Sequence, residues 1–409
     1  MPSITRRTLL GTLAAGVGAG VAGCSSSCPD SDDPTPTTVF GTGDATGGFD
    51  SLPGGSWPSP RFDAGNTGHA PSRRPPESPS LRWRTTLSAP RADGAAVSAP
   101  VVDADTVYLA TSAGAVALAL GDGSVRWRTD SISPTTMAST VGVDELVPPV
   151  VADGRVYLAA SSGLVALDAA DGETVWRYDS SPTGVPAVHG SGLFVPLEER
   201  LAHLDGDGAE RWTADVDASH PAVADGRVVA SGREETVALD AATGERRWSA
   251  SVDAETHPVV ADGTVYLGAY GGVTALVLDD GSERWHVDRG GGRHFSAPVV
   301  TPETVYAVER PVEVGDATFA LDRAADPPEP RWCSYVGEGT VAAAAGDHVF
   351  TLQGSGTGAT PVRLVSFTTR FGEATWGYAA RDRVLPPAIL DGGGVVATRR
   401  GTVVGFGGD

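Results

Sequence analysis

Residues 149–178 read PVVADGRVYLAASSGLVALDAADGETVWRY, and variants of this stretch recur along most of the chain. Its four short apolar segments alternate with period two, which predicts four strands separated by ADG, SSG and AADG. Asp-Gly and other Gly-containing pairs tolerate the positive φ of tight hairpins, so each break predicts a turn. The repeating unit is therefore expected to be a four-stranded antiparallel meander.

Tryptophan marks the last strand of each unit. Eight of the nine tryptophans fall at this one position, at intervals of 36 to 49 residues. They are Trp83, Trp127, Trp176, Trp212, Trp248, Trp285, Trp332 and Trp376. A self-similar period in this range, with four strands per unit, predicts an all-β fold of the β-propeller type with eight blades.

The two ends of the repeat region predict how the ring closes. The last unit, from Pro387 to Phe406, has only three strands before the chain ends. LRWRTTL, at Leu81 to Leu87, has an outer-strand Trp but no three strands before it. We expect this N-terminal strand to complete the C-terminal blade, because that pairing removes the open edges of the ring.

These repeats carry a family resemblance. VALDAADGETVW at Val165 to Trp176 and VALDAATGERRW at Val237 to Trp248 resemble the tryptophan-docking repeat of PQQ-type propellers. WPSPRFDAGNTG at Trp57 to Gly68 resembles the segment that opens the propeller in the BamB-like family of outer-membrane assembly lipoproteins. The resemblance covers roughly residues 57–406 and implies tryptophans packed between blades. It leaves function open, because this superfamily holds both quinoprotein dehydrogenases and non-catalytic scaffolds.

Composition limits the class of partner. All 30 basic residues among the 409 are arginine, against 51 acidic residues, which gives a net charge of -21. Such an acidic surface argues against nucleic acid or an anionic membrane surface as the partner. An acidic chain without lysine resembles proteins of salt-loving archaea, whose surfaces stay hydrated in concentrated salt.

The N-terminus resembles an export signal. Paired Arg6 and Arg7 precede an apolar, glycine-rich stretch that ends at Cys24. This pattern is similar to a twin-arginine signal with a lipobox, and it implies that residues 1–23 are removed and that Cys24 carries a lipid. The alternative is an uncleaved anchor, but the apolar stretch is short for a span of about 20 residues. The expected location is the outer face of the cytoplasmic membrane.

Residues 24–56 are predicted to form a flexible tether, since they contain few large apolar residues. The propeller then occupies residues 57–409 and is expected to be monomeric. Cys28 lies in the tether and Cys333 in a strand, and this wide spacing favours two unpaired thiols over a disulfide framework or a metal site.

Catalytic patterns are not apparent. The resemblance implies that a quinoprotein dehydrogenase would hold PQQ and calcium with carboxylates and amides, often with adjacent cysteines. The chain has no Cys-Cys pair, Asn66 is its only asparagine, and its Asp residues, including Asp205 and Asp207, fall mostly in the repeated turns. GxSxG and HExxH are absent, and a Walker-type loop is excluded without lysine. We therefore expect no catalytic residue and no cofactor, with PQQ and calcium as the alternative.

Histidine interrupts the repeat at one position. The residue before the Pro of the innermost strand is His220 in one unit and His257 in the next, and His294 lies three residues before the corresponding position of the following unit. In a propeller these positions ring one mouth of the central channel. A transition-metal or anionic-ligand site is one interpretation, and solvated histidines at loop ends are the other.

Insertions give a second indication of function. The links at residues 129–147, 309–317 and 353–361 are longer than in the regular units and are predicted to emerge on the same face as His220 and His257. We therefore expect a non-catalytic, membrane-tethered binding or assembly scaffold for an extracytoplasmic protein or a surface polymer. The alternatives are a PQQ-dependent oxidoreductase and a sensor that binds a small ligand or metal at the channel mouth.

Overall fold

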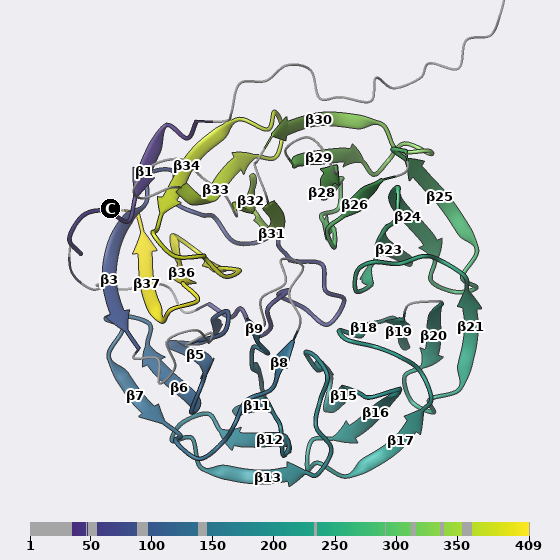
Figure 1. Cartoon of the computed structure of the whole chain (residues 1–409), viewed down its shortest axis with the longest axis horizontal. Helices are drawn as coiled ribbons and strands as arrows, with labels where there is room; N and C mark the ends of the chain where they lie inside the picture. The colour runs from purple at the N-terminus through teal and green to yellow at the C-terminus, as the bar shows by residue number, and fades with distance from the viewer. Residues whose placement is uncertain are drawn as a thin grey trace, which may run out of the picture.

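The computed structural model describes residues 35–45, 47, 55–87, 97–137, 145–232, 235–290, 292–311, 316–335, 339–353 and 362–408. These residues form strands and turns, and none of their segments is a helix long and apolar enough to cross a membrane. The sheets stand around a common centre, each with one end strand near the centre and the other at the circumference (Figure 1). The predicted all-β propeller built of four-stranded antiparallel sheets is confirmed.

Regular four-stranded sheets make up most of this arrangement. From the centre outward, five of them comprise β4 (Val101–Asp103), β5 (Thr106–Thr111), β6 (Gly114–Ala119) and β7 (Val125–Arg128); β10 (Val150–Ala152), β11 (Arg155–Ala160), β12 (Gly163–Asp168) and β13 (Thr174–Tyr178); β14 (Ala187–His189), β15 (Gly192–Leu197), β16 (Arg200–Asp205) and β17 (Glu210–Ala214); β18 (Ala222–Ala224), β19 (Arg227–Ser231), β20 (Thr236–Asp240) and β21 (Arg246–Ala250); and β22 (Val259–Ala261), β23 (Thr264–Ala269), β24 (Gly272–Val277) and β25 (Glu283–Asp288).

Three further sheets combine a meander with other strands. They comprise β27 (Val299–Val300), β28 (Thr304–Pro311), β29 (Ala317–Asp322) and β30 (Pro330–Tyr335) with β26 (Arg293–Phe295); β31 (Gly339–Ala345), β32 (His348–Gln353), β33 (Val362–Thr368) and β34 (Ala374–Ala379) with β1 (Thr38–Phe40) and β2 (His69–Ala70); and β35 (Ala388–Leu390), β36 (Gly393–Ala397) and β37 (Thr402–Gly407) with β3 (Ser80–Thr86). In the last sheet β3 pairs antiparallel with β37, from Ser80 opposite Gly407 to Thr86 opposite Thr402.

The ADG sequences form the hairpins between the first and second strands of their sheets. Asp153, Asp225 and Asp262 have φ of 49°, 48° and 47°, and the glycine after each also has positive φ. Two consecutive residues of positive φ are typical of a type I′ turn, whose twist matches that of the flanking strands. The repeated Asp-Gly pairs are therefore explained by backbone geometry.

The core is divided into layers between neighbouring sheets. In one such layer, Tyr108 and Ala117 of one sheet pack with Val156 and Leu158 of the next. Each layer buries β-branched and aliphatic side chains from both sheets, so each sheet depends on its two neighbours for burial.

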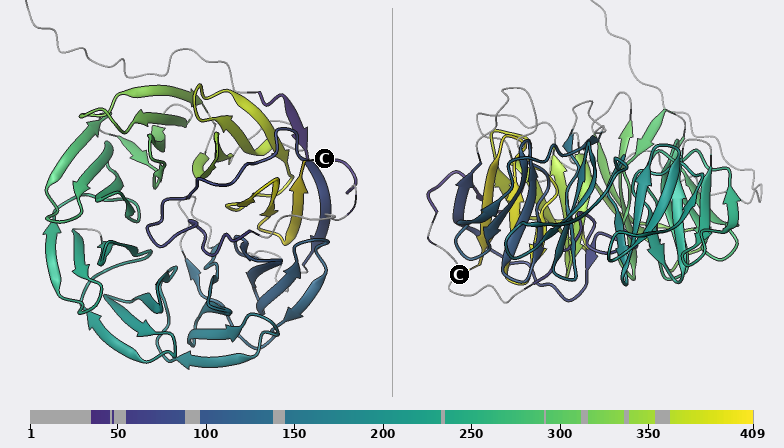
Figure 2. Two further views of the ribbon diagram at one scale, coloured as in Figure 1. Left: turned by 180° about the vertical axis from the view of Figure 1, so that it is seen from behind. Right: turned by 90° about the horizontal axis from the view of Figure 1, so that it is seen from below.

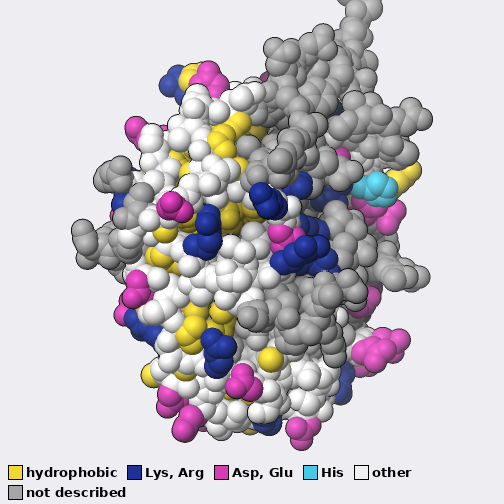
Figure 3. All heavy atoms as spheres, turned by 60° about the vertical axis from the view of Figure 1, so that its left-hand side comes forward, with side chains coloured by type: hydrophobic (Ala, Val, Ile, Leu, Met, Phe, Trp, Pro, Cys, Tyr) yellow, Lys and Arg dark blue, Asp and Glu magenta, His cyan; other side chains and the backbone are white. Residues whose placement is uncertain are grey.

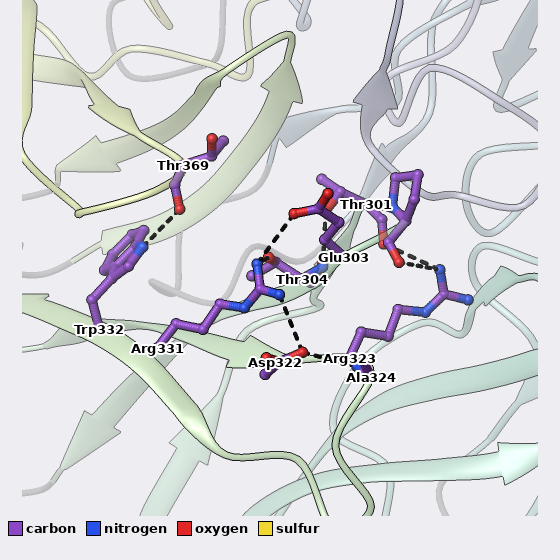
Figure 4. A network of polar contacts seen from close by, with 10 residues as sticks. Thr301, Glu303, Thr304, Asp322, Arg323, Ala324, Arg331, Trp332 and Thr369 are labelled. Atoms are coloured by element: carbon purple, nitrogen blue, oxygen red, sulfur yellow. Dashed lines mark hydrogen bonds and ion pairs between the residues drawn. The ribbon is translucent and has the colours of Figure 1, made fainter.

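Six tryptophans of the outer strands donate a hydrogen bond from their indole nitrogen to the next sheet, whereas Nε1 of the buried Trp376 has no partner among the described residues. Trp127 Nε1 donates to Ala169 O at 2.9 Å, and its ring lies on Gly172, where an added Cβ would be 2.6 Å from Trp127 Cε3. The same pairing recurs in other sheets, and Figure 4 shows Trp332 donating to Thr369 O at 2.9 Å. The indole contributes apolar area and also supplies a donor for a turn carbonyl. The glycine of the turn is required because any side chain there would collide with the ring.

Part of the predicted flexible tether is instead paired with the propeller. β1 runs parallel to β34, with Val39 opposite Gly377, and extends that sheet at the circumference. Phe40 is buried there among Trp376, Tyr378 and Phe406, with ring centroids 5.2 to 5.7 Å apart. The composition of residues 24–56 did not indicate this, because a single Phe supplies the buried contact.

Cys333 in β30 is disulfide-bonded, which corrects the expectation of an unpaired thiol. The wide spacing of the cysteines in the sequence gave no sign of this bond. The predicted export signal, with Arg6, Arg7 and the lipidated Cys24, lies outside the described residues, as does Cys28. On the side shown in Figure 3, arginine and acidic side chains are interspersed rather than separated by sign.

Candidate functional site

The segment before the first outer strand runs along the inner edges of the sheets at one end of the central channel. We call residues 57–74 the channel segment. Its carbonyls accept hydrogen bonds from inner-strand amides of six sheets at 2.6 to 3.0 Å, and Trp57 exchanges two with Val102. The accepting residues and their donors are Trp57 and Val102, Pro58 and Val151, Ala64 and Val223, Gly65 and Val260, Thr67 and Val300, and Gly68 and Ala344. Figure 2 shows the segment crossing the middle of the ring when the molecule is seen from behind.

Asn66 fixes the channel segment between two sheets. Its Nδ2 donates to Pro221 O and to Pro258 O, both at 3.2 Å, and its φ is 59°. Asparagine suits this position because it tolerates the left-handed region and carries two amide donors. The only asparagine of the chain therefore has a structural role, which its singularity in the sequence did not reveal.

Arg61 extends from the channel segment into the channel. Its Nε donates to Asn66 O at 3.3 Å, and Nη2 donates to Pro298 O. Burial lowers the pKa of Arg61 to about 10, although Asp63 opposes this change, so the guanidinium remains charged at neutral pH. Asp63 in turn accepts from Thr67 N at 2.9 Å and Thr67 Oγ1 at 2.6 Å. The channel segment thus holds a fixed positive charge near the axis.

A cavity of about 650 Å³ occupies the channel above Arg61. Its floor contains Pro60 and Arg61, and its walls come from residues at or just before the inner strands of the surrounding sheets. These wall residues include Ala99, Pro148, Val185, His220, His257, Ala297, Val341 and Pro386. Because the channel segment closes one end, we call this cavity the cup.

Added elements surround the open end of the cup. The hairpin of β8 (Thr136–Met137) and β9 (Glu145–Leu146) contributes Met137 and Glu145, and β26 contributes His294. Arg310, at the start of another long link, also lines the cavity. The structure therefore brings two of the long links to the same face as the histidines, as predicted. The third link, 353–361, lies mostly outside the described residues.

His220 and His257 lie side by side in the cup. Their ring centroids are 4.9 Å apart at an interplanar angle of 25°. Burial, together with the charge of Arg61, lowers the pKa of His220 to about 4, and burial, His220 and Arg61 lower that of His257 well below its ordinary value. Both rings are therefore neutral at pH 7, although each keeps some contact with the solvent of the cavity.

His294 lines the same cavity but belongs to a different contact. Its Nδ1 lies 2.6 Å from Glu255 Oε1, and its ring meets Tyr270 edge-on at 5.7 Å. Across the mouth, Arg383 Nη2 pairs with Glu145 Oε1 at 3.0 Å. Burial raises the pKa of Glu145, while Arg383 and Arg399 act in the opposite direction. Both carboxylates that line the cup thus already have partners.

Sequence reasoning found the histidines but missed the charged groups beside them. Arg61 was visible in the segment that resembles the opening of BamB-like propellers, yet nothing in the spacing placed it under the histidines. The links between strands vary from unit to unit, so the repeat does not predict where their residues lie. Such links contain Glu145, Glu255 and Arg383. Among the described residues, no three His, Cys, Asp or Glu side chains are close enough together to hold a metal ion.

Calcium-bound PQQ does not fit the donor set of the cup. The lining supplies two carboxylates, and each is engaged by a basic side chain, whereas calcium takes 6 to 8 oxygen ligands. The side-chain amide of Asn66, the only asparagine, already donates to the Pro221 and Pro258 carbonyls.

Comparisons with known proteins agree with this fold. The family model described as outer membrane protein assembly factor BamB matches residues 76–206. No curated protein sequence matches the chain. Among solved structures, BamB from Moraxella catarrhalis is similar with a TM-score of 0.56 and 16% identity, covering 81% of this chain and 98% of that one.

Two enzymes are similar at the same level. Quinohemoprotein alcohol dehydrogenase from Comamonas testosteroni gives a TM-score of 0.64 at 15% identity, covering 86% of this chain and 80% of that one. A quinohemoprotein alcohol dehydrogenase from Pseudomonas putida HK5 gives 0.62 at 13%, with the same coverage. Identities this low establish the fold alone. Together, the family match and these structures support placing the fold in the PQQ-like β-propeller superfamily.

Proposed function

We propose that this chain is an eight-bladed propeller, closed by β3 and β37, that serves as a non-catalytic binding scaffold through the open mouth of the cup. The observation that carries the proposal is the asymmetry of the channel. In the described part of the chain, the channel segment crosses one end, whereas the cavity at the other end is framed by β8, β9 and β26. These framing elements are additions to the regular repeat, and added elements around a concave, partly apolar cavity are typical of a binding site.

The proposed partner is an extracytoplasmic protein. The match to the BamB model supports protein binding in general, because that family is described as an assembly factor. The task of that family concerns outer-membrane proteins, and it does not transfer to a cell without an outer membrane. We therefore retain only the general class, with a surface polymer as the alternative partner.

The proposed location is the outer face of the cytoplasmic membrane. It rests on the twin-arginine and lipobox pattern, with a lipid on Cys24. Replacing Cys24 with Ser should release the protein into the medium or leave its signal uncleaved. Unchanged membrane association after that replacement would contradict a lipid anchor.

Site-specific photocrosslinking in intact cells tests the scaffold proposal. A photoreactive amino acid at Met137 or Thr340, which line the mouth, should capture one recurrent protein. The matched control is Val175, which is 47% exposed on an outer strand and far from the cup in the sheet order. Equal capture from both positions, or none from the mouth, would overturn binding through the mouth.

The enzyme alternative has its own test. Purified protein is incubated with PQQ and calcium, desalted, and assayed for a bound quinone spectrum and for dye-linked alcohol oxidation. We expect neither stoichiometric uptake nor turnover, because the cup lacks free carboxylates. Stoichiometric uptake with turnover would replace the scaffold by a quinoprotein oxidoreductase.

A further inference from the structure

The floor of the cup holds polar groups that have no protein partner. No ring nitrogen of His220 or His257 forms a hydrogen bond with a described residue, and Nε2 of His257 is enclosed without a partner. Arg61 uses only two of its five N–H groups on backbone carbonyls. Enclosed polar groups are normally satisfied, so groups left free in a cavity indicate a ligand or ordered water.

The positive charge of Arg61 favours an anionic ligand over a cationic one. Arg61 is fixed in place by the channel segment, and its positive charge acts on both histidines. The two glutamates that line the cup are paired with His294 and Arg383, and the lining contains three arginines against these two carboxylates. A metal ion beside Arg61 would be repelled, whereas an anion would gain a charge-assisted hydrogen bond.

The side chains of the cup walls favour an anion that carries an apolar group. The walls are built largely from aliphatic and aromatic side chains above the charged floor, among them Ala99, Leu146, Val185, Phe295, Val341 and Leu385. A cavity of about 650 Å³ lies in the range of small-molecule sites, and it is larger than a halide or phosphate needs. An inorganic ion would leave most of these walls in contact with water.

We propose that Arg61, His220 and His257 bind the carboxylate of an organic anion whose apolar body lies against the walls of the cup. This inference rests on the proposed function, since it assigns the chemistry of the ligand to the same mouth. The carboxylate can belong to a free small molecule or to a side chain or C-terminus of the partner protein. In both cases the recognised unit is a carboxylate attached to an apolar group.

Binding should be coupled to proton uptake. An anion beside the two imidazoles favours their charged forms, whereas burial and the charge of Arg61 disfavour them in the free protein. The other charged or titratable groups of the cup are Glu255 with His294, Glu145 with Arg383, and Arg310, while Asp63 lies beside Arg61. Affinity should therefore increase as the pH falls from 8 toward 5.

The test uses 2-naphthoate and its uncharged analogue 2-naphthamide as probes, titrated by calorimetry at constant ionic strength. We expect naphthoate to bind at least about tenfold more tightly than naphthamide, because the two differ mainly in charge. Titration in two buffers of different ionisation enthalpy should show net proton uptake near pH 6. Equal affinity of the two probes would overturn the proposal and leave an unspecific apolar cavity.

Variants of Arg61, His220 and His257 test whether these residues cause the preference for naphthoate. Arg61→Gln should abolish the preference for naphthoate, and His220→Phe with His257→Phe should abolish proton uptake while the apolar walls remain. Because Arg61 also bonds the channel segment, Arg61→Lys is included as a variant that keeps the charge. If a folded Arg61→Gln protein still bound naphthoate more tightly than naphthamide, Arg61 would not be the carboxylate-binding residue. The same conclusion would follow if Arg61→Lys and the wall variant Val185→Ala lost this preference to the same extent.

The two proposals can fail separately. If a protein is crosslinked at Met137 and naphthoate competes with it, the carboxylate belongs to that partner. If naphthoate binds while no protein is crosslinked, the scaffold proposal fails and the anion site stands as a small-ligand site. If a protein is crosslinked while naphthoate shows no advantage over naphthamide, the anion site fails and the scaffold stands.

Discussion

The circumference of this molecule is held by contacts that repeat from sheet to sheet, whereas the channel is held by contacts that each occur once. At the circumference the same contact recurs, a tryptophan on the turn glycine of the next sheet, as in Trp127 on Gly172 and Trp212 on Gly244. In the channel each contact occurs once, as for Asn66 between Pro221 and Pro258. The circumference therefore holds the ring together by repetition, whereas the channel depends on single residues that no other unit can replace.

The largest effect should come from a single-copy residue of the channel. In Asn66→Asp the amide donor becomes a carboxylate that faces two carbonyl oxygens. Asn66 is buried, so the charge would have little contact with water and would be directed at carbonyl oxygens rather than at a donor. We expect a loss of about 3–5 kcal/mol in the free energy of unfolding at pH 7, typical of an uncompensated buried charge. Denaturant unfolding measures it.

Asn66→Gly is the matched control. It keeps the freedom to adopt the φ of 59° but removes the amide without adding a charge. The loss should be about 1–3 kcal/mol, from two carbonyls left without a donor. If the Asp and Gly variants were equally stable, Asn66 would not bridge the two sheets as described.

The docking contact at the circumference should give the next largest effect. Gly244 has a φ of 76°, and an added Cβ would lie 2.7 Å from Trp212 Cδ2. Gly226, in the same sheet, has a φ of 71° with nothing within 4 Å. Gly244→Ala should cost about 2–4 kcal/mol, from backbone strain and overpacking together, whereas Gly226→Ala should cost about 1–2 kcal/mol from strain alone.

Thermal or denaturant unfolding of these two variants separates docking from backbone strain. Only Gly244→Ala should also change the tryptophan fluorescence of the folded protein, because only its added methyl group contacts an indole, that of Trp212. Equal losses of stability in both variants would show that the ring does not depend on this contact.

The two regions also differ in how far the sequence predicted them. Turns such as Asp153-Gly154 and the eight marker tryptophans were predictable, because each position is repeated and backbone geometry allows few residues there. β1 was not predicted, since its pairing with β34 depends on one buried Phe40 in a polar stretch. The disulfide of Cys333 also left no local signal.

In the channel the sequence located the histidines but not their chemistry. The positions of His220 and His257 follow from the repeat register, which places them on neighbouring inner strands. Burial is the main cause of their low pKa, and Arg61 lowers it further. Arg61 is more than 150 residues away in the sequence and reaches them only because the channel segment runs along the inner edges. Such long-range proximity is set by the assembled ring and has no local pattern.

The histidine pair should make the channel sensitive to acid. Because the pKa of His220 is about 4 in the folded protein and near 6.5 when unfolded, the unfolded chain binds more protons between these values. Stability is therefore lost as the pH falls from 6.5 to 4, by at most about 2 kcal/mol at pH 5 from this residue.

Denaturant unfolding of the wild type and of His220→Phe with His257→Phe, each at pH 7 and pH 5, isolates this contribution. The wild type should lose more stability than the variant between the two values. Carboxylates elsewhere titrate equally in both proteins and cancel in the difference. A variant that lost as much stability as the wild type would mean that the histidines are not kept neutral in the fold.

The smallest effect should come from ion pairs at the circumference. Arg126 and Asp105 form two hydrogen bonds, at 2.6 and 2.9 Å, but their side chains are 38% and 71% exposed. Their coupling energy in a double-mutant cycle of Arg126→Gln and Asp105→Asn should be below about 1 kcal/mol and should fall further in molar salt. Coupling that persisted in salt would mean that charge pairing, rather than tryptophan docking, holds the circumference together. The 51 acidic residues outnumber the 30 arginines, so at least 21 of them cannot have an arginine of their own. We therefore expect the cohesion of the ring to come chiefly from its apolar layers and docked tryptophans.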